Sequence, residues 1–138
     1  MFRKVLKSES GSSSVVGFMV VLPLAILITI NPLYMLFDTI KYIKADAVVR
    51  KCIVQMETQG GLTPEGYSDL VNKLAQLGFR NINVEYTPYP VDFGDSVYIK
   101  VTAQVKANRV SFFGGLVNDY RPVRFGTYES ISKKSYGE

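Results

Sequence analysis

The 138-residue sequence has no histidine and a single cysteine, Cys52. Zinc, haem and iron–sulfur sites need several histidine, cysteine or carboxylate ligands that converge on one metal. A serine nucleophile likewise needs a neighbouring base, most often histidine. We therefore expect no metal site and no cofactor. Cys52 is expected to be a small apolar core residue, with an intermolecular disulfide as the alternative, because a disulfide framework needs cysteine pairs.

The carboxylates also lack an arrangement that would support catalysis. Asp92-Phe93-Gly94 matches the magnesium motif of protein kinases, but the glycine-rich loop and the catalytic-loop signature are missing, so we expect a turn. Asp92 and Asp95 do not have the spacing of an EF-hand calcium loop. Glu85 and Asp95 are expected to be solvated on opposite rims of a loop. The sequence thus predicts no catalytic residues and no enzymatic activity.

The net charge of +4 is not concentrated in one domain. Residues 1–14 carry three basic residues and one acidic residue, whereas residues 38–138 carry thirteen basic and eleven acidic residues. A nucleic-acid-binding domain would instead gather lysine and arginine on its own surface. We therefore expect no nucleic-acid partner.

Residues 15–37 form a run of twenty-three residues without a charged side chain. As a helix this run would be roughly 34 Å long, enough to cross a hydrocarbon core of about 30 Å. Pro23 and Pro32 are tolerable in a membrane helix, and Asn31 is the one strongly polar residue. A buried core helix of a soluble protein is the alternative, but such runs are usually shorter. We predict a membrane span, or an apolar stem that assembles from the membrane.

Residues 1–14 are predicted to be a basic leader or cytoplasmic tail. A cleaved signal peptide fits poorly, because the apolar run is too long and no small-residue cleavage site lies near its end. Arg3, Lys4 and Lys7 favour a cytoplasmic N-terminus, yet four basic residues follow the run within fifteen positions. Charge counting alone therefore leaves the topology open.

The helical pattern continues beyond the apolar run as an amphipathic extension over residues 38–59. There is no glycine or proline from residue 38 to residue 57, whereas a flexible linker would be rich in both. Apolar residues recur at spacings of three and four and form one stripe, which we expect to cover one face of a sheet. The stripe consists of Tyr42, Ala45, Val49, Cys52 and Met56.

Residues 61–131 are predicted to form a small head. Gly60-Gly61 ends the first helix, and Thr63-Pro64 begins a short second helix that stops at Gly78. Alternating residues predict a strand around Ile82, Val84 and Tyr86, an antiparallel strand over residues 96–107, and a third strand over residues 123–131. We expect residues 132–138 to be a mobile tail. The fold class is α+β, with a long N-terminal helix, one short helix and a three-stranded antiparallel sheet.

Aromatic residues are frequent in the last third of the chain. Tyr98 falls on the polar face of its strand, and Tyr89 and Phe93 fall in a loop. Apolar side chains left outside a small core often mark an interface, although ordinary sheet packing with a few exposed rings is the alternative. The aromatic set is Tyr86, Tyr89, Phe93, Tyr98, Phe112, Phe113, Tyr120, Phe125 and Tyr128.

A basic leader, the Gly11-Ser12 step and Val21-Leu22-Pro23 in the apolar run precede this long helix and small head. The order resembles type IV pilin-like proteins and, more narrowly, the TadE-like pilus-assembly proteins with their Gram-positive single-span relatives. The resemblance covers about residues 8–57 and does not extend over the head. Further residues that match are Phe18 and the stretch Asp46-Ala47-Val48-Val49-Arg50-Lys51.

The resemblance implies a structural subunit of an extracellular filament, a pilus, whose N-terminal helix packs with copies of itself. Other pilus components and, before assembly, membrane lipid are the further partners that it implies. The chain would cross the cell membrane once, with a cytoplasmic N-terminus and an extracellular head, and would then enter a cell-surface filament. In such a filament Pro23, Asn31 and Pro32 are expected helix-packing positions, and Asn31 could bond to a helix of another copy.

The resemblance also implies processing after Gly11 or Gly17. In the family a glutamate follows the processed glycine by about five residues, whereas this chain has Val16 or Leu22 there. An alternative from another class is a monomeric, membrane-anchored accessory or assembly protein that presents its head to a partner.

Overall fold

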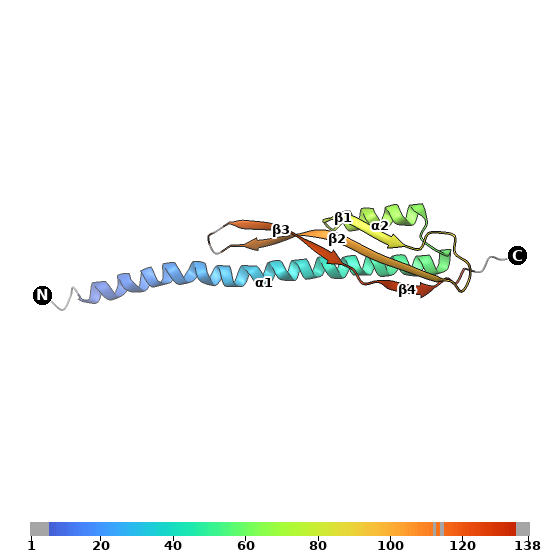
Figure 1. Ribbon diagram of the computed structural model, residues 1–138. Coiled ribbons are helices and arrows are strands. Elements are labelled where there is room, and N and C mark those ends of the chain that lie inside the picture. The colour runs from blue at the N-terminus through green and yellow to red at the C-terminus, as the bar shows by residue number, and fades with distance from the viewer. Residues whose placement is uncertain (1–5, 112, 114, 135–138) are drawn as a thin grey trace. The chain divides into compact units, whose positions relative to one another are not determined.

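The computed structural model describes residues 6–111, 113 and 115–134, and the side chains from residue 14 onward (Figure 1). It confirms the α+β class. The described residues divide into two compact units, Met1–Leu36 with Asn108–Val117, and Phe37–Ala107 with Asn118–Glu138. The elements are α1 (Leu6–Gln59), α2 (Pro64–Gln76), β1 (Phe79–Tyr86), β2 (Ser96–Val110), β3 (Leu116–Arg124) and β4 (Tyr128–Ile131).

Helix α1 runs for 54 residues and continues through Pro23 and Pro32. It begins at Leu6, so most of the predicted leader is already helical, and it ends directly before Gly60-Gly61, as expected. Gly60 and Gly61 have φ angles of +78° and +115°, in the region that favours glycine. A Cβ atom on Gly61 would lie 2.8 Å from the carbonyl oxygen of Pro88, so a side chain is excluded there.

Helix α2 has the predicted capping. The hydroxyl oxygen of Thr63 accepts a hydrogen bond from the Gly66 N–H at 3.1 Å, and Pro64 is the first helical residue. Leu70 and Leu74 are buried, and Gly78 follows the helix with a φ of +91°. The second helix therefore forms where the sequence places it, with one apolar face in the core.

Strand β2 is central in the sheet. It pairs antiparallel with β1, where Val84 lies opposite Val101, and with β4, where Ile99 lies opposite Tyr128. Because Ile99 is also opposite Tyr86, β1 and β4 lie on opposite edges of β2. The strand order β1-β2-β3 places β3 on the same edge as β4. The predicted three-stranded sheet is present, and β4 is an additional short strand.

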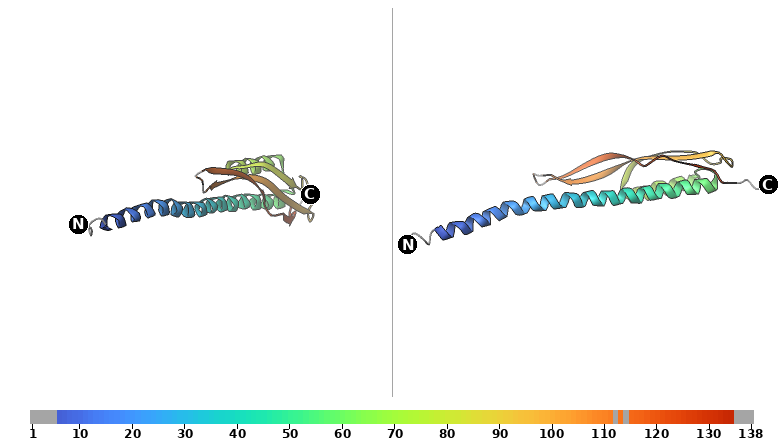
Figure 2. Two further views of the ribbon diagram at one scale, coloured as in Figure 1. Left: turned by 60° about the vertical axis from the view of Figure 1, so that its left-hand side comes forward. Right: turned by 90° about the horizontal axis from the view of Figure 1, so that it is seen from below.

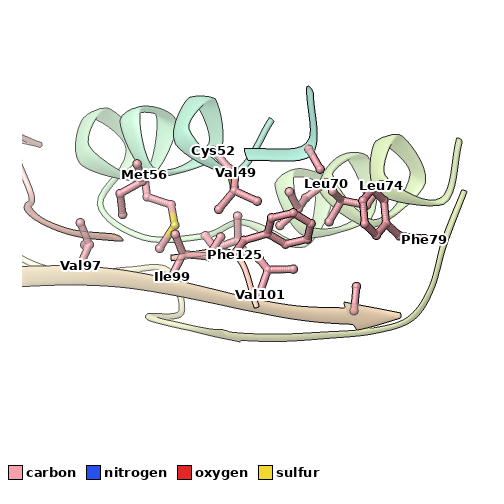
Figure 3. Packing of buried hydrophobic residues seen from close by; sticks show 14 of the residues in the cluster. Val49, Cys52, Met56, Leu70, Leu74, Phe79, Val97, Ile99, Val101 and Phe125 are labelled. Carbon is pink, nitrogen blue, oxygen red and sulfur yellow. The ribbon is translucent and has the colours of Figure 1, made fainter. Parts of the chain in front are cut away.

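The core of the second unit lies between this sheet and a layer of helices formed by α2 and the second half of α1 (Figure 2). Strand β2 alternates as predicted, with its odd-numbered residues from Val97 to Ala107 buried. Figure 3 shows the side chains of Val49, Cys52 and Met56 from α1 and of Leu70 and Leu74 from α2 pointing toward those of β2. The apolar stripe of α1 therefore packs on the sheet face that the sequence analysis assigned to it.

Two predictions about the end of the chain are wrong. The third strand predicted over residues 123–131 is two strands, because β3 ends at Arg124 and β4 begins at Tyr128. Between them Phe125 is buried, and its N–H bonds to the Val101 carbonyl at 3.0 Å. The predicted mobile tail begins with residues that are held in place. Ser132 is buried and its N–H donates to Asp95 O at 2.8 Å, while the Lys133 N–H donates to Glu57 O at 2.7 Å. Residues 135–138 lie outside the described part of the chain.

Candidate functional site

The first candidate interaction surface is the apolar segment of α1. An 18-residue window of this helix has a mean hydropathy of 2.3, and none of that window is buried. A core helix of a soluble protein would instead be mostly buried against its own chain. One N-terminal helix is therefore long and apolar enough to cross a membrane. Its exposed large side chains lie between Val15 and Phe37 and include Phe18, Met19, Ile28, Leu33 and Met35.

The predicted processing and stem positions all lie in α1. Gly11 and Gly17 are helical, and a Cβ atom on Gly17 would meet no atom within 4 Å. Pro23 and Pro32 are exposed, and each lacks the N–H that would bond the carbonyl four residues earlier in a regular helix. The surface near them is thus apolar and exposed, which is compatible with a packing role.

Asn31 is hydrogen-bonded within its own chain. Its Nδ2 donates to the carbonyl oxygen of Val110 at 3.4 Å, and its Oδ1 accepts from the Val110 N–H at 3.2 Å. Both residues belong to the first compact unit. A bond from Asn31 to a helix of another copy stays a prediction; within the chain, β2 extends to Val110, three residues further than predicted, and Val110 engages the amide.

The apolar stripe of α1, which lies in the second unit, is buried and not exposed. Ala45, Val49 and Met56 have no exposed surface, Cys52 is 5% exposed, and Tyr42 is half-buried against the same cluster. These five predicted positions are brought together, but in the core of the head. Their role within this chain is to hold the sheet on the helix.

Burial also sets the chemistry of Cys52. Removal from water raises the pKa of its thiol to about 11. At pH 8 a thiol with that pKa is thiolate in about one molecule in a thousand, and the thiolate is the reactive form. We expect Cys52 in the folded chain to resist maleimide and to form no intermolecular disulfide, and to react rapidly once urea unfolds the head. Maleimide labelling followed by mass spectrometry measures the reactivity of the thiol, and a non-reducing gel detects an intermolecular disulfide. Rapid labelling of the folded chain would contradict the burial.

A polar cluster joins α1 to β4 on the surface of the second unit. The Tyr128 hydroxyl donates to Asp46, and the Arg50 Nε donates to Asp46 at 2.8 Å and to the Tyr128 oxygen at 3.0 Å. Burial and the hydrogen bond to Asp46 raise the pKa of Tyr128. Asp46 and Arg50, which were part of the family resemblance, thus anchor β4 to α1.

Glu57 forms a second connection, at the end of α1. Ser130 donates to its Oε1 at 2.6 Å and Lys133 to its Oε2 at 2.9 Å. These hydrogen bonds lower the pKa of the Glu57 carboxyl. The arrangement fastens the residues directly after β4 to the helix.

The loop between β1 and β2 contains the predicted turn. The Asp95 N–H donates to Asp92 O at 3.2 Å, and Gly94 has a φ of +89°. Among the residues that the structure describes, no three histidine, cysteine, aspartate or glutamate side chains come together where they could hold a metal ion. Tyr89, Phe93 and Tyr98 are exposed.

The aromatic residues therefore divide between core and surface. Phe125 is buried and packs edge-on against Phe79, with ring centroids 5.3 Å apart. Phe112 lies outside the described residues. Sequence analysis missed the part played by the end of the β2–β3 hairpin, where Phe113, Leu116 and Val117 are exposed beside Val110. Its one sequence signal is the apolar stretch around Gly114-Gly115, which lies between the strands predicted over residues 96–107 and 123–131.

Comparison of the chain with protein families, with curated proteins and with solved structures found no match.

Proposed function

We propose that this chain is a membrane-inserted, pilin-like structural subunit that assembles into an extracellular filament through the apolar segment of α1. The observation that carries the proposal is the unburied window of mean hydropathy 2.3 in that helix. Full burial of one large apolar side chain is worth about 1.5–3 kcal/mol, so covering the fourteen large exposed ones from Val15 to Phe37 is worth up to roughly 20–40 kcal/mol. This free energy is larger than the net stability of a typical protein, which is about 5–15 kcal/mol. The apolar segment is therefore expected to be covered and not left in water.

Two environments can cover such a surface. Lipid covers it before assembly, and the helices of neighbouring copies cover it in a filament core. The N-terminus would be cytoplasmic and the head extracellular, and processing would occur after Gly11 or Gly17. Other pilus components are the remaining proposed partners. The head would be displayed outward, and it needs no catalytic group for this role.

A monomeric anchored accessory protein is the second candidate. It is favoured by Asn31, the one strongly polar group of the stem, because one donor and one acceptor of its amide already engage Val110 of the same chain. Such a protein would stay in the membrane and present its head to a partner.

Shearing of surface fibres separates the two candidates. Cells that express the full chain are sheared, and fibres and washed membranes are probed with an antibody to the head. We expect the chain in the fibres as a repeating component, seen by immunogold labelling along their length. Absence from fibres together with complete retention in membranes would overturn the filament proposal and leave the anchored protein.

A further inference from the structure

The end of the β2–β3 hairpin is a second apolar surface, separate from the helix. The hairpin tip consists here of the described residues Val110, Ser111, Phe113, Gly115, Leu116 and Val117. Phe113 is 95% exposed, Leu116 66% and Val117 51%. Large apolar side chains at the end of a hairpin add nothing to the core of the second unit, so their exposure needs another explanation.

The tip is fixed to the apolar segment of α1. The described residues of Met1–Leu36 and Asn108–Val117 form one compact unit, and the two hydrogen bonds between Asn31 and Val110 join them. A carboxamide that donates to the C=O and accepts from the N–H of one residue fixes the position of that strand end along the helix. The tip must therefore share the environment of the helix around Asn31.

The depth of Asn31 follows from the charge pattern. Residues 10–37 are twenty-eight consecutive residues without a charge. As a helix they span roughly 42 Å, which matches the about 40–45 Å of a bilayer with its interfacial layers. If this segment is centred in the membrane, Asn31 lies about 11 Å from the midplane, just inside the edge of a hydrocarbon core about 30 Å thick.

The tip has the properties that this boundary requires. Backbone groups near hydrocarbon must be satisfied within the protein, and the Ser111 N–H donates to Gly115 O at 2.8 Å while Asn31 satisfies Val110. Arg109, directly before the tip and in the same compact unit, is exposed. Basic residues next to an apolar insertion favour anionic phospholipid headgroups.

We propose that the hairpin tip is a second membrane-contacting element, which enters the interfacial layer of the same phospholipid bilayer that α1 crosses. The inference rests on the proposed membrane insertion of α1. Leu116 and Val117 lie at the boundary of the acyl chains, and Arg109 lies among the headgroups. The tip then fixes the depth and the rotation of α1 in the bilayer, which a single apolar helix would not do by itself.

Single tryptophans test the proposal directly, because the natural chain has none. The full chain is reconstituted into phosphatidylcholine–phosphatidylglycerol vesicles with tryptophan at one of three exposed apolar positions. Leu116→Trp reports on the tip, Val20→Trp on the helix segment, and Phe93→Trp on the β1–β2 loop of the head as the matched aqueous control. Emission is measured with lipids brominated close to the headgroup or deep in the acyl chain.

We expect the tip tryptophan to be blue-shifted relative to Phe93→Trp and quenched most by shallow bromines, with Val20→Trp quenched most by deep ones. Adding Asn31→Leu should weaken quenching at position 116, because the tip loses its attachment, while position 20 should still be quenched most by deep bromines. Quenching at position 20 with none at position 116 would overturn the tip proposal and leave membrane insertion of α1 standing. A blue-shifted tip without bromine quenching would also overturn it, in favour of cover by another protein copy. No quenching at position 20 would overturn the membrane span itself.

Discussion

Val49→Asp is expected to unfold the head at neutral pH. Val49 has no exposed surface and points from α1 toward the sheet (Figure 3). An uncompensated buried charge costs about 3–5 kcal/mol, which is most of the net stability of a small domain. Thermal unfolding of the full chain in detergent, followed by near-ultraviolet circular dichroism, measures the loss.

The matched control is Val54→Asp, the same substitution five residues further along the same helix. Val54 is 55% exposed, so we expect a change within about 0.5 kcal/mol. Equal effects of the two substitutions would mean that the stripe of α1 does not face the sheet.

The pH dependence of Val49→Asp adds an independent check. Burial disfavours the charged form, so the introduced carboxyl has a folded pKa above its unfolded value of about 3.9. The folded state then binds the proton more tightly than the unfolded state, and acid favours folding at this site. The stability deficit of the variant relative to the natural chain should therefore shrink as pH falls from about 7 toward 4. A deficit that stayed constant over this interval would point to altered packing and not to charge.

Local patterns in the sequence determine most of the fold. The Gly60-Gly61 stop, the Thr63 cap and the alternation from Val97 to Val105 each depend on neighbouring residues, and all appear in the structure as predicted. The stripe from Tyr42 to Met56 follows from helical spacing alone. These features were predictable because the residues that cause them lie within a few positions of one another.

The features that the sequence did not predict depend on contacts between distant residues. Asn31 and Val110 are separated by 79 positions, and no local pattern pairs an amide in an apolar helix with a hairpin end. The ordering of Ser132 and Lys133 likewise depends on Asp95 and Glu57. The exposure of the hairpin tip could not be foreseen, because an apolar stretch beside Gly-Gly is equally compatible with a buried connection.

Two arginines in the middle of the apolar segment should release the chain from membranes. Leu22→Arg and Ile26→Arg lie one helical turn apart near the centre of the uncharged segment, and both positions are exposed within the chain. Each arginine at a helix centre opposes insertion by about 2.5–3.5 kcal/mol, so the pair lowers the equilibrium constant for insertion by a factor of at least thousands if the two add. The measurement is the amount of full-length chain left in carbonate-washed membranes.

The control must separate loss of the apolar surface from a mere change of net charge. Val54→Arg with Phe93→Arg adds the same charge at two exposed apolar positions of the head, and we expect this variant to be retained like the natural chain. If both double variants were released equally, charge and not the apolar segment would decide retention. If neither were released, some other part of the molecule would have to hold it in the bilayer, because a segment carrying two unpaired arginines at its centre would no longer be stably inserted.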